Sequence, residues 1–371
     1  MKFNVNQRRM YLLALGLLIL AIVLACTWLL LRGEDEQVSL NPSPSPAAAA
    51  EPPVMPRIDD EMTAANASPT QKPAQKASTI VYYQDNDGYL VPVMCSVPME
   101  DGIAKATLNL MVKNTGNDMQ AARMGLRTVL PENTTIELDI ANGLARIDLS
   151  DEVLDLADAA AEQNMVSAVV GALTEFDTVQ EVEFLIGGQK LEKLPHGTSV
   201  SGRFRRCDIN LESADEAMSV SESKRVTLYF PSEAGTVVVP VTRLVYSNPD
   251  INTAVLELAK GPSATGSLEN VLPAGCGLIS VNVENGTAKL NFTKEFADIA
   301  LNTDGGRMAL KALVLTCTQF EGVKGVEIYI EGEKYDPGTG TLSVPTFANV
   351  ADTIVYDYIQ TQSAMIMGSM E

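Results

Sequence analysis

The chain repeats itself, and this duplication constrains its fold more than any other feature of the sequence. The stretch NGLARIDLS, which begins at Asn142, returns 143 residues later as NGTAKLNFT, which begins at Asn285. Each copy places an Asn-Gly pair, typical of a two-residue hairpin turn, before an alternating apolar run. A single pair of this kind can arise by chance, so the flanking sequence decides whether a whole domain was copied.

The flanking segments also match, and in the same order. The matching pairs are IVYYQDNDGYLVPV (80–93) with VTLYFPSEAGTVVVPV (226–241), ATLNLMVK (106–113) with AVLELAK (254–260), VLPENTTI (129–136) with VLPAGCGL (271–278), and LTEFDTVQEVEFLIGG (173–188) with CTQFEGVKGVEIYIEG (317–332). The offset changes only across polar or Gly/Pro-containing stretches, where loops tolerate changes of length. The chain is therefore a tandem duplication.

Each repeat predicts the order strand, strand, helix, strand, strand, helix, strand. Asp87-Gly88 predicts a hairpin turn in the first repeat, and the Asn-Gly pairs predict one in both. Apolar periodicity predicts helices over 103–113 and 159–174 in the first repeat and over 251–260 and 306–318 in the second, with Asp250 as a helix cap. We expect an α+β fold of two tandem repeats, each a small mixed β-sheet with two helices packed on one face.

The N-terminus differs from the rest of the chain. Residues 10–31 carry no charge and, as a helix of ~33 Å, would be long enough to cross a hydrocarbon core of ~30 Å. Basic residues precede this segment and Glu34, Asp35 and Glu36 follow it, so the positive-inside rule places the N-terminus in the cytoplasm and the body outside it.

Two interpretations of this segment remain open. It is either an uncleaved transmembrane anchor or a signal segment that is cut before a lipidated Cys26, because Val23-Leu24-Ala25-Cys26 resembles a lipobox. The apolar run that continues over 27–31 favours the anchor, since a lipidated cysteine usually begins a polar tether. In both interpretations the body is tethered to a membrane outside the cytoplasm.

Composition predicts the domain organisation. We expect an anchor or signal segment over 1–32, a disordered Pro/Ala/Ser-rich linker over 33–78, a first domain over 79–200, an inter-domain linker over 201–223, a second domain over 224–348 and a C-terminal tail over 349–371. The tail sequence fits equally a terminal helix packed on a domain and a partner-binding segment.

Charge and cysteine content limit the partners. The first 32 residues hold four of the 27 basic residues and none of the 47 acidic ones, so the remainder carries 23 basic and 47 acidic residues, a formal charge of −24. Such a surface repels nucleic acid and anionic lipid headgroups, and we expect neither as a partner of the body.

The state of the cysteines is not determined by their spacing. Disulfides and free thiols both remain open for Cys95, Cys207, Cys276 and Cys317.

The duplication also provides a test for catalytic residues, because a catalytic group with the same role in both halves should appear in both repeats. The residues that appear twice are turn and core residues: Pro92/Pro240, Pro131/Pro273, Gly143/Gly286, Gly188/Gly332 and Phe176/Phe320. Asp148 faces Asn291, so this carboxylate is not kept. Glu152 and Glu295 match, but each begins a predicted helix, where an acid favours the helix dipole.

Other candidate residues are weak. His196 is the single histidine and lies in a predicted loop, so the chain offers no histidine pair for zinc. DNDGY (85–89) resembles part of a calcium loop, but Tyr83 and Met94 occupy its first and twelfth ligand positions. We predict no catalytic, cofactor-binding or metal-binding residue, and no cofactor.

The motifs VTLYFP, AVLELAKGP, VLPAGCGLISVNVENGTAKLNFT and VEIYIEG resemble the GerMN (sporulation and spore germination) domain family, over residues 80–200 and 224–346. The first repeat departs from the pattern, because Asn114-Thr115-Gly116 replaces the Gly-Pro after the helix and six extra residues lie between Val93 and Pro131. This departure affects the binding surface that the resemblance implies for the first repeat more than its fold.

The resemblance implies a non-enzymatic module, similar in shape to the ring-building motifs of envelope machines. It implies a part in the complex that spans the two membranes between mother cell and forespore, with other envelope proteins or copies of the chain as partners, and it adds weight to lipidation of Cys26. The alternative is a peptidoglycan-binding module that uses an exposed Tyr83 or Tyr89. A hydrolase is the weakest candidate, because the sequence contains no paired catalytic motif.

Overall fold

The computed structural model describes residues 76–99, 102–213, 223–246, 248–263, 266–301, 303–336, 342–343 and 347–352. The chain divides into two compact units, Met1–Pro69 and Thr70–Glu371, and all described residues belong to the second. The predicted anchor, Cys26 and nearly all of the predicted linker lie outside the described residues. Within the described ranges, no helix has the length and apolarity that a membrane span requires.

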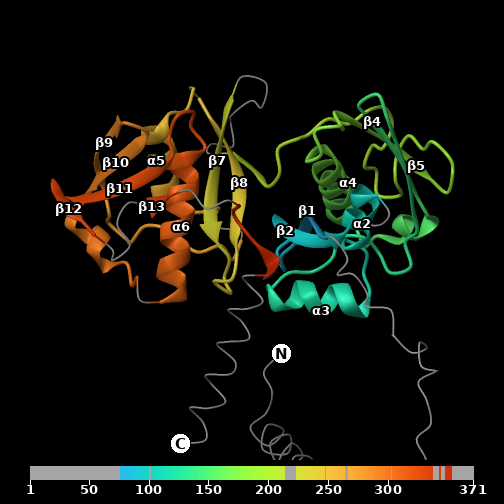
Figure 1. Ribbon diagram of the computed structural model, residues 1–371, viewed down its shortest axis with the longest axis horizontal. Helices are drawn as coiled ribbons and strands as arrows, with labels where there is room; N and C mark the ends of the chain where they lie inside the picture. The colour runs from blue at the N-terminus through green and yellow to red at the C-terminus, as the bar shows by residue number, and fades with distance from the viewer. Residues whose placement is uncertain are drawn as a thin grey trace, which may run out of the picture. The chain divides into compact units, whose positions relative to one another are not determined.

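The first repeat follows the predicted order of elements except for one additional helix, α3 (Figure 1). It consists of β1 (Lys76–Gln84), β2 (Leu90–Pro98), α2 (Ile103–Asn109), α3 (Thr115–Arg123), β3 (Ile136–Ala141), β4 (Leu144–Leu149), the 3₁₀ helix η1 (Asp151–Asp155), α4 (Ala159–Thr174) and β5 (Glu181–Ile186).

The second repeat has the same order without a counterpart of α3. It consists of β7 (Lys224–Pro231), β8 (Val238–Val245), α5 (Ile251–Ala259), β9 (Leu278–Glu284), β10 (Thr287–Phe292), the 3₁₀ helix η2 (Lys294–Asp298), α6 (Asp304–Thr318) and β11 (Gly325–Ile330). Three short strands flank these elements: β6 (Leu211–Ser213), β12 (Glu333–Tyr335) and β13 (Leu342–Ser343).

The extra residues of the first repeat form helix α3. Asn114 is its N-cap, and the Asn114 side chain accepts a hydrogen bond from the Asn117 N–H at 3.0 Å. The departure from the family pattern at Asn114-Thr115-Gly116 is therefore the start of an inserted helix, which the periodicity of the sequence does not show.

The predicted hairpin turns are present. Asn142 and Gly143 have φ values of 52° and 80°, and Asn285 and Gly286 have φ values of 52° and 79°. Two successive residues with positive φ make a type I′ turn, which matches the twist of the flanking strands and requires Asn-Gly or a similar pair. The two hairpins, β3–β4 and β9–β10, therefore close in the same way.

The strands of each repeat form two sheets, so the expectation of one mixed sheet per repeat is wrong. In the first repeat, β1 and β2 form an antiparallel hairpin, and β3, β4 and β5 form a separate sheet in which β4 and β5 are parallel. The second repeat separates β7–β8 from β9–β10–β11 in the same manner. The helices join these layers, because α4 contacts both β1 and β5, and α6 contacts both β7 and β11.

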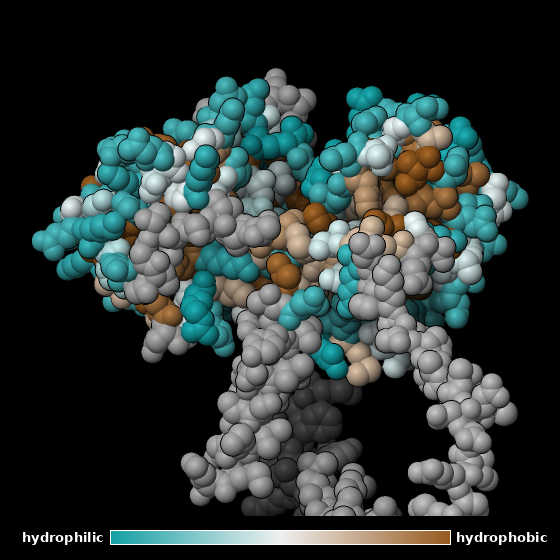
Figure 2. All heavy atoms as spheres, viewed as in Figure 1, coloured by the Kyte–Doolittle hydropathy of each residue, from teal (hydrophilic) through white to brown (hydrophobic). Residues whose placement is uncertain are grey.

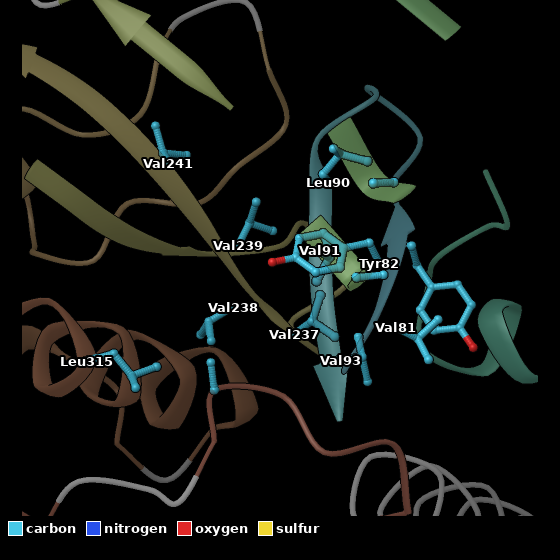
Figure 3. Packing of buried hydrophobic residues seen from close by; sticks show 14 of the residues in the cluster. Val81, Tyr82, Leu90, Val91, Val93, Val237, Val238, Val239, Val241 and Leu315 are labelled. Atoms are coloured by element: carbon cyan, nitrogen blue, oxygen red, sulfur yellow. The ribbon is translucent and has the colours of Figure 1, made fainter. Parts of the chain in front are cut away.

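A shared hydrophobic core connects the repeats. The predicted apolar faces of the long helices are buried, including Val169 and Leu173 of α4 and Leu310 and Leu313 of α6. The buried residues of both repeats belong to one contiguous cluster. Figure 3 shows valines of β2 facing valines at the start of β8, and every residue of β8 is buried. Strand β8 therefore packs on two sides, as an internal strand does.

Candidate functional site: the seam between the repeats

The seam joins the outer edge of β2 to the outer edge of β8. Pro92 lies at the middle of β2, opposite Tyr82 of β1, and Pro240 lies at the equivalent place in β8, opposite Tyr229 of β7. A proline cannot donate a ladder hydrogen bond, so it is tolerated where a strand has no further backbone partner on that side. The duplicated prolines therefore mark the two edges that face each other.

Asn210 connects these edges on one side of the seam. Its Oδ1 accepts a hydrogen bond from the Leu90 N–H at 2.8 Å, and its Nδ2 donates to the carbonyl oxygens of Leu90 at 2.8 Å and Pro240 at 2.7 Å. The backbone oxygen of Asn210 accepts from the Thr242 N–H at 3.2 Å. One asparagine therefore pairs backbone groups of both strands.

Asn349 makes the same contacts with the repeats exchanged. Its Oδ1 accepts from the Val238 N–H at 2.9 Å, and its Nδ2 donates to the carbonyl oxygens of Val238 at 2.8 Å and Pro92 at 3.1 Å. Its backbone oxygen accepts from the Met94 N–H at 2.8 Å. Because Leu90, Pro92 and Met94 are the equivalents of Val238, Pro240 and Thr242, the seam has an approximate two-fold symmetry.

The segment that follows each repeat therefore pairs with the other repeat. Leu211 of β6 pairs with Thr242 in parallel, and Val350 pairs with Met94 in parallel. Sequence reasoning missed both asparagines, because they lie in the predicted linker and tail at an offset of 139, outside the matching segments. A signal was present nonetheless: each repeat is followed by an asparagine next to an aliphatic residue.

A cavity of about 420 Å³ lies at the seam, and equivalent residues of both repeats line it, including Tyr82 and Tyr229. Tyr82 donates a hydrogen bond to Glu175 at 2.8 Å, and Arg206 pairs with the same carboxylate oxygen at 2.6 Å. Burial, followed by the nearby Glu175 charge, raises the pKa of Tyr82, so its phenol stays protonated near neutral pH. These groups provide a hydrogen bond and an ion pair at the seam.

Arg243 anchors the linker strand β6 to the second repeat. Its side chain is 6% exposed, pairs with Glu212 at 2.8 Å and donates to the backbone oxygens of Glu257 and Gly261, both at 2.8 Å. The equivalent residue of the first repeat is Cys95, so comparing the repeats gave no indication of this buried cation.

Asp148 and Asn291 have the same structural role. The Oδ1 of Asp148 accepts a hydrogen bond from the Gly188 N–H at 2.9 Å, and the Oδ1 of Asn291 accepts from the Gly332 N–H at 2.9 Å. An acid and an amide are interchangeable at this position because only the acceptor oxygen is used. The glycines are duplicated for a backbone reason. Gly188 and Gly332 have φ values of 77° and 90°, a conformation that glycine adopts without steric cost.

Glu152 and Glu295 lie in the first turns of η1 and η2, as expected for structural acids. Side-chain hydrogen bonds from Ser150 and Thr293, respectively, lower their pKa values. Both carboxylates therefore stabilise helix starts, which agrees with the structural interpretation of this matching pair.

The loop around His196 is held by a buried carboxylate of α4. The two oxygens of Glu162 accept hydrogen bonds from the N–H groups of His196 at 2.7 Å and Thr198 at 3.1 Å. His196 itself is exposed, and its Nε2 lies 2.8 Å from the Leu156 carbonyl oxygen. The loop position predicted for this histidine from sequence agrees with this geometry.

The DNDGY segment forms the loop of the β1–β2 hairpin. Asp85 Oδ1 accepts hydrogen bonds from the N–H groups of Asp87 at 3.0 Å and Tyr89 at 2.8 Å. The carboxylate is therefore engaged within its own turn. Among the residues that the structure describes, no group of three or more His, Cys, Asp or Glu side chains is placed to hold a metal ion.

The four cysteines of the described body are free thiols. Burial raises the pKa of Cys95 to about 12 and that of Cys317 to about 12, and burial together with the Glu295 charge raises that of Cys276 to about 11. These three thiols are protonated at neutral pH and are therefore poor nucleophiles. The fourth, Cys207, is exposed at the seam cavity.

Of the two tyrosines considered for stacking on sugars, Tyr83 is fully buried, so its predicted exposure is wrong. It lies in the core because it occupies an inward position of β1, where its hydroxyl is 4.0 Å from Cys95 Sγ. Tyr89 is half-buried, with its hydroxyl 3.4 Å from Glu212 Oε1, and it lines a polar hollow of about 580 Å³.

Fold and seam together define a tandem-repeat α+β protein in which two copies of one module close on each other. The chain belongs to the Germane family, described as sporulation and spore germination, which matches residues 80–192 and 227–336. It is 31% identical over 307 residues to the spore germination protein GerM of Bacillus subtilis strain 168, covering 77% of this chain and 83% of the relative.

One solved structure agrees with this assignment over most of the chain. The tandem GerMN domains of the B. subtilis sporulation protein GerM superpose with a TM-score of 0.58 at 28% identity, over 74% of this chain and 99% of that chain. The first GerMN domain of the same protein matches at 30% identity, over 35% of this chain and 98% of that chain, with a TM-score of 0.33.

Proposed function

We propose that the protein is a non-enzymatic, membrane-tethered assembly component of an envelope-spanning complex that acts outside the cytoplasm in sporulation or spore germination. The role in sporulation or germination comes from the family and from GerM, the B. subtilis relative. The tether comes from the uncharged N-terminal segment, residues 10–31, and its flanking charges.

One observation carries the assembly role: the duplicated polar residues that can be traced in both repeats maintain backbone geometry. Asp148 and Asn291 hold glycine turns, and Glu152 and Glu295 stabilise the starts of 3₁₀ helices. Duplication has thus retained a scaffold, which favours binding over catalysis.

The seam limits which surfaces are available to partners. The outer edges of β2 and β8 are occupied by Asn210, Asn349 and the chain around them. By contrast, β3 pairs only with β4 and β9 pairs only with β10 among the described strands. We therefore assign partner contacts to the sheets that end in β3 and β9, and to neighbouring helix surfaces.

The assembly role is tested by recovery of partners. A tagged full-length chain, expressed at its native level and purified from sporulating cells of its own organism in mild detergent, should recover other envelope proteins, and its deletion should impair spore formation or germination. The matched control is the tagged N-terminal segment 1–75, which keeps the tether and lacks the repeats. Normal spores after deletion, together with no partner beyond that control, would contradict the proposal.

The nature of the tether has a direct test. Mass spectrometry of the mature N-terminus distinguishes a diacylated or triacylated Cys26 from an intact segment 1–32. Cys26→Ala should abolish acylation and processing in the first case and leave localisation unchanged in the second. Release of the wild-type chain into the soluble fraction without acylation would contradict both forms of the tether.

The peptidoglycan-binding alternative now depends on Tyr89, since Tyr83 is buried. If the polar hollow beside Tyr89 binds glycan, the wild-type body should pellet with purified cell wall and the Tyr89→Ala variant should not. Equal behaviour of the two proteins would argue against this alternative.

A further inference from the structure

Strand β9 has an uncharged edge over residues 278–283, unlike its counterpart in the first repeat. Residues 278–283 contain no charged residue and no proline, whereas β3 carries the exposed acids Glu137 and Asp139. Proteins usually shield an edge strand with charge, proline or covering chain, because its unpaired backbone groups attract other strands. Edge β3 is shielded by charge, whereas β9 carries neither charge nor proline over 278–283 and has a register shift at Ile279 in its ladder with β10.

The side chains of β9 are apolar and accessible. Ile279 is 52% exposed and Val283 is 46% exposed, and Val281 is half-buried. Val281 and Val283 pair with Leu290 and Ala288 of β10, which belong to the core, so both valines lie on the core face of the sheet. Val281 packs partly against the core, and Val283 is left exposed. Strand β3 repeats this arrangement, since Ile140 is 38% exposed and pairs with the buried Ala145. On the face seen in Figure 2, apolar atoms gather over the sheet of β4 and β5.

The backbone of β9 is also free to pair. Its hairpin closes with a two-residue turn, so Glu284 and Thr287, which flank that turn, form the first ladder pair. Ladder bonds alternate along an antiparallel strand, which directs the N–H and C=O groups of Val283 and Val281 away from β10. No backbone hydrogen bond from another described residue reaches these groups.

We propose that β9 pairs with β9 of a second copy of the chain, antiparallel about a two-fold axis through Val281. This deepens the proposed assembly role, on which it rests, by assigning the contact through which copies associate. The axis places Val281 opposite itself, so β-branched side chains face each other at the centre of the new pair. It also brings Val283 near Ile279, which lies at the register shift of the β9–β10 ladder. Such an interface closes at two copies and does not continue into a ring.

Charge favours a second copy as the occupant. Two chains of formal charge −20 repel each other, so they associate best through a neutral surface, which the β9 edge provides. The terminal acid Glu284 is paired with Lys289 of the same hairpin at 2.5 Å, and it would face Leu278 of the partner rather than another acid. A basic partner strand would instead favour the acids Glu137 and Asp139 of β3.

The association is expected to be weak in solution. Pairing of two seven-residue strands buries less than the roughly 1,200 Å² that is common for stable complexes. A shared membrane would raise the effective concentration of tethered copies.

Sedimentation of the compact unit, residues 70–371, over a wide range of concentration tests the inference. We expect a reversible monomer–dimer equilibrium that Val283→Lys and Ile279→Lys weaken at least about ten-fold, because each places like charges beside the axis. The matched control is Ile140→Lys, which makes the corresponding change on β3. Thermal unfolding of each variant shows that it is folded.

Amide hydrogen exchange locates the contact independently of any variant. The N–H groups of Val281 and Val283 should exchange more slowly as concentration rises, and those of Leu138 and Ile140 should not change. A protein that remains monomeric, a dimer insensitive to Val283→Lys, or larger assemblies without protection of β9 would overturn the inference.

The inference and the proposed function fail separately. If residues 70–371 remain monomeric while the full-length chain still recovers envelope proteins, the β9 pairing is wrong and the assembly role stands. The opposite result is that the fragment dimerises through β9, while the full-length chain recovers no partner beyond the 1–75 control and spores are normal after deletion. In that case the β9 pairing stands and the assembly role is wrong.

Discussion

At the scale of single residues, asparagine carries the most structural information in this protein. Asn142 and Asn285 shape hairpin turns, Asn291 replaces the acid Asp148, and Asn210 and Asn349 join the repeats. The amide suits the seam because it donates and accepts at once, as a peptide group does.

Replacing Asn349 tests the seam. Asn349 is fully buried, and Asn349→Ala leaves the Val238 N–H and the carbonyl oxygens of Val238 and Pro92 without these partners. We expect the free energy of unfolding, measured in urea, to fall by roughly 2–4 kcal/mol. The control Asn282→Ala removes an exposed asparagine and should change it by less than about 0.5 kcal/mol. Equal effects would show that the seam contributes little stability.

Glu162 predicts a specific dependence on pH. Burial opposes its ionisation, but hydrogen bonds from the His196 and Thr198 N–H groups outweigh burial, so the folded pKa lies below the ordinary value of about 4.3. A depressed pKa gives stability that is present above the unfolded pKa and lost as pH falls through the folded one. The excess stability of the wild type over Glu162→Gln should therefore be constant near neutral pH and shrink in acid, as measured by urea unfolding. A constant difference down to the acid limit would contradict this.

At the scale of elements, helix α4 is fixed on β1 by close packing at Gly171. A Cβ atom built on Gly171 would lie 2.8 Å from the Tyr82 ring, which is itself buried. Glycine costs about 1 kcal/mol relative to alanine inside a helix, so its presence here reflects this contact. The counterpart of Gly171 in the second repeat is Leu315, which also lines the seam cavity.

We therefore expect Gly171→Ala to destabilise the protein although alanine favours helix formation. Displacing the buried ring should cost about 1–3 kcal/mol, more than the gain in helix propensity. Gly116→Ala in the exposed first turn of α3 is the control, since its nearest atom is 3.4 Å away, and it should be neutral or stabilising. Thermal unfolding measures both variants, and a stabilised Gly171→Ala would show that Tyr82 is free to move.

At the scale of the whole molecule, the two repeats share one core and one seam. Their segments are exchanged across that seam, because β6 pairs with β8 and Val350 pairs with Met94. The repeats are thus expected to unfold together, as parts of one cooperative unit.

Calorimetry tests this cooperativity. Residues 70–371 should show a single transition whose calorimetric and van't Hoff enthalpies agree. The double variant Asn210→Ala/Asn349→Ala should separate this into two transitions, one for each repeat. Two transitions in the wild type would instead show that the seam does not couple the repeats.

The sequence by itself determined the duplication, the order of strands and helices, the Asn-Gly turns and the cap at Asp250, because turn geometry, apolar periodicity and capping are set within short windows of chain. It also identified Pro92 and Pro240 as equivalent residues of the two repeats, but not that both lie at strand edges of the seam. Only the tertiary structure decided the separation of each repeat into two sheets, the burial of Tyr83 and the seam through Asn210 and Asn349. These features depend on groups that lie more than a hundred residues apart, such as Leu90 with Asn210 and Val238 with Asn349, and no local signal specifies which distant backbone group a side chain will meet.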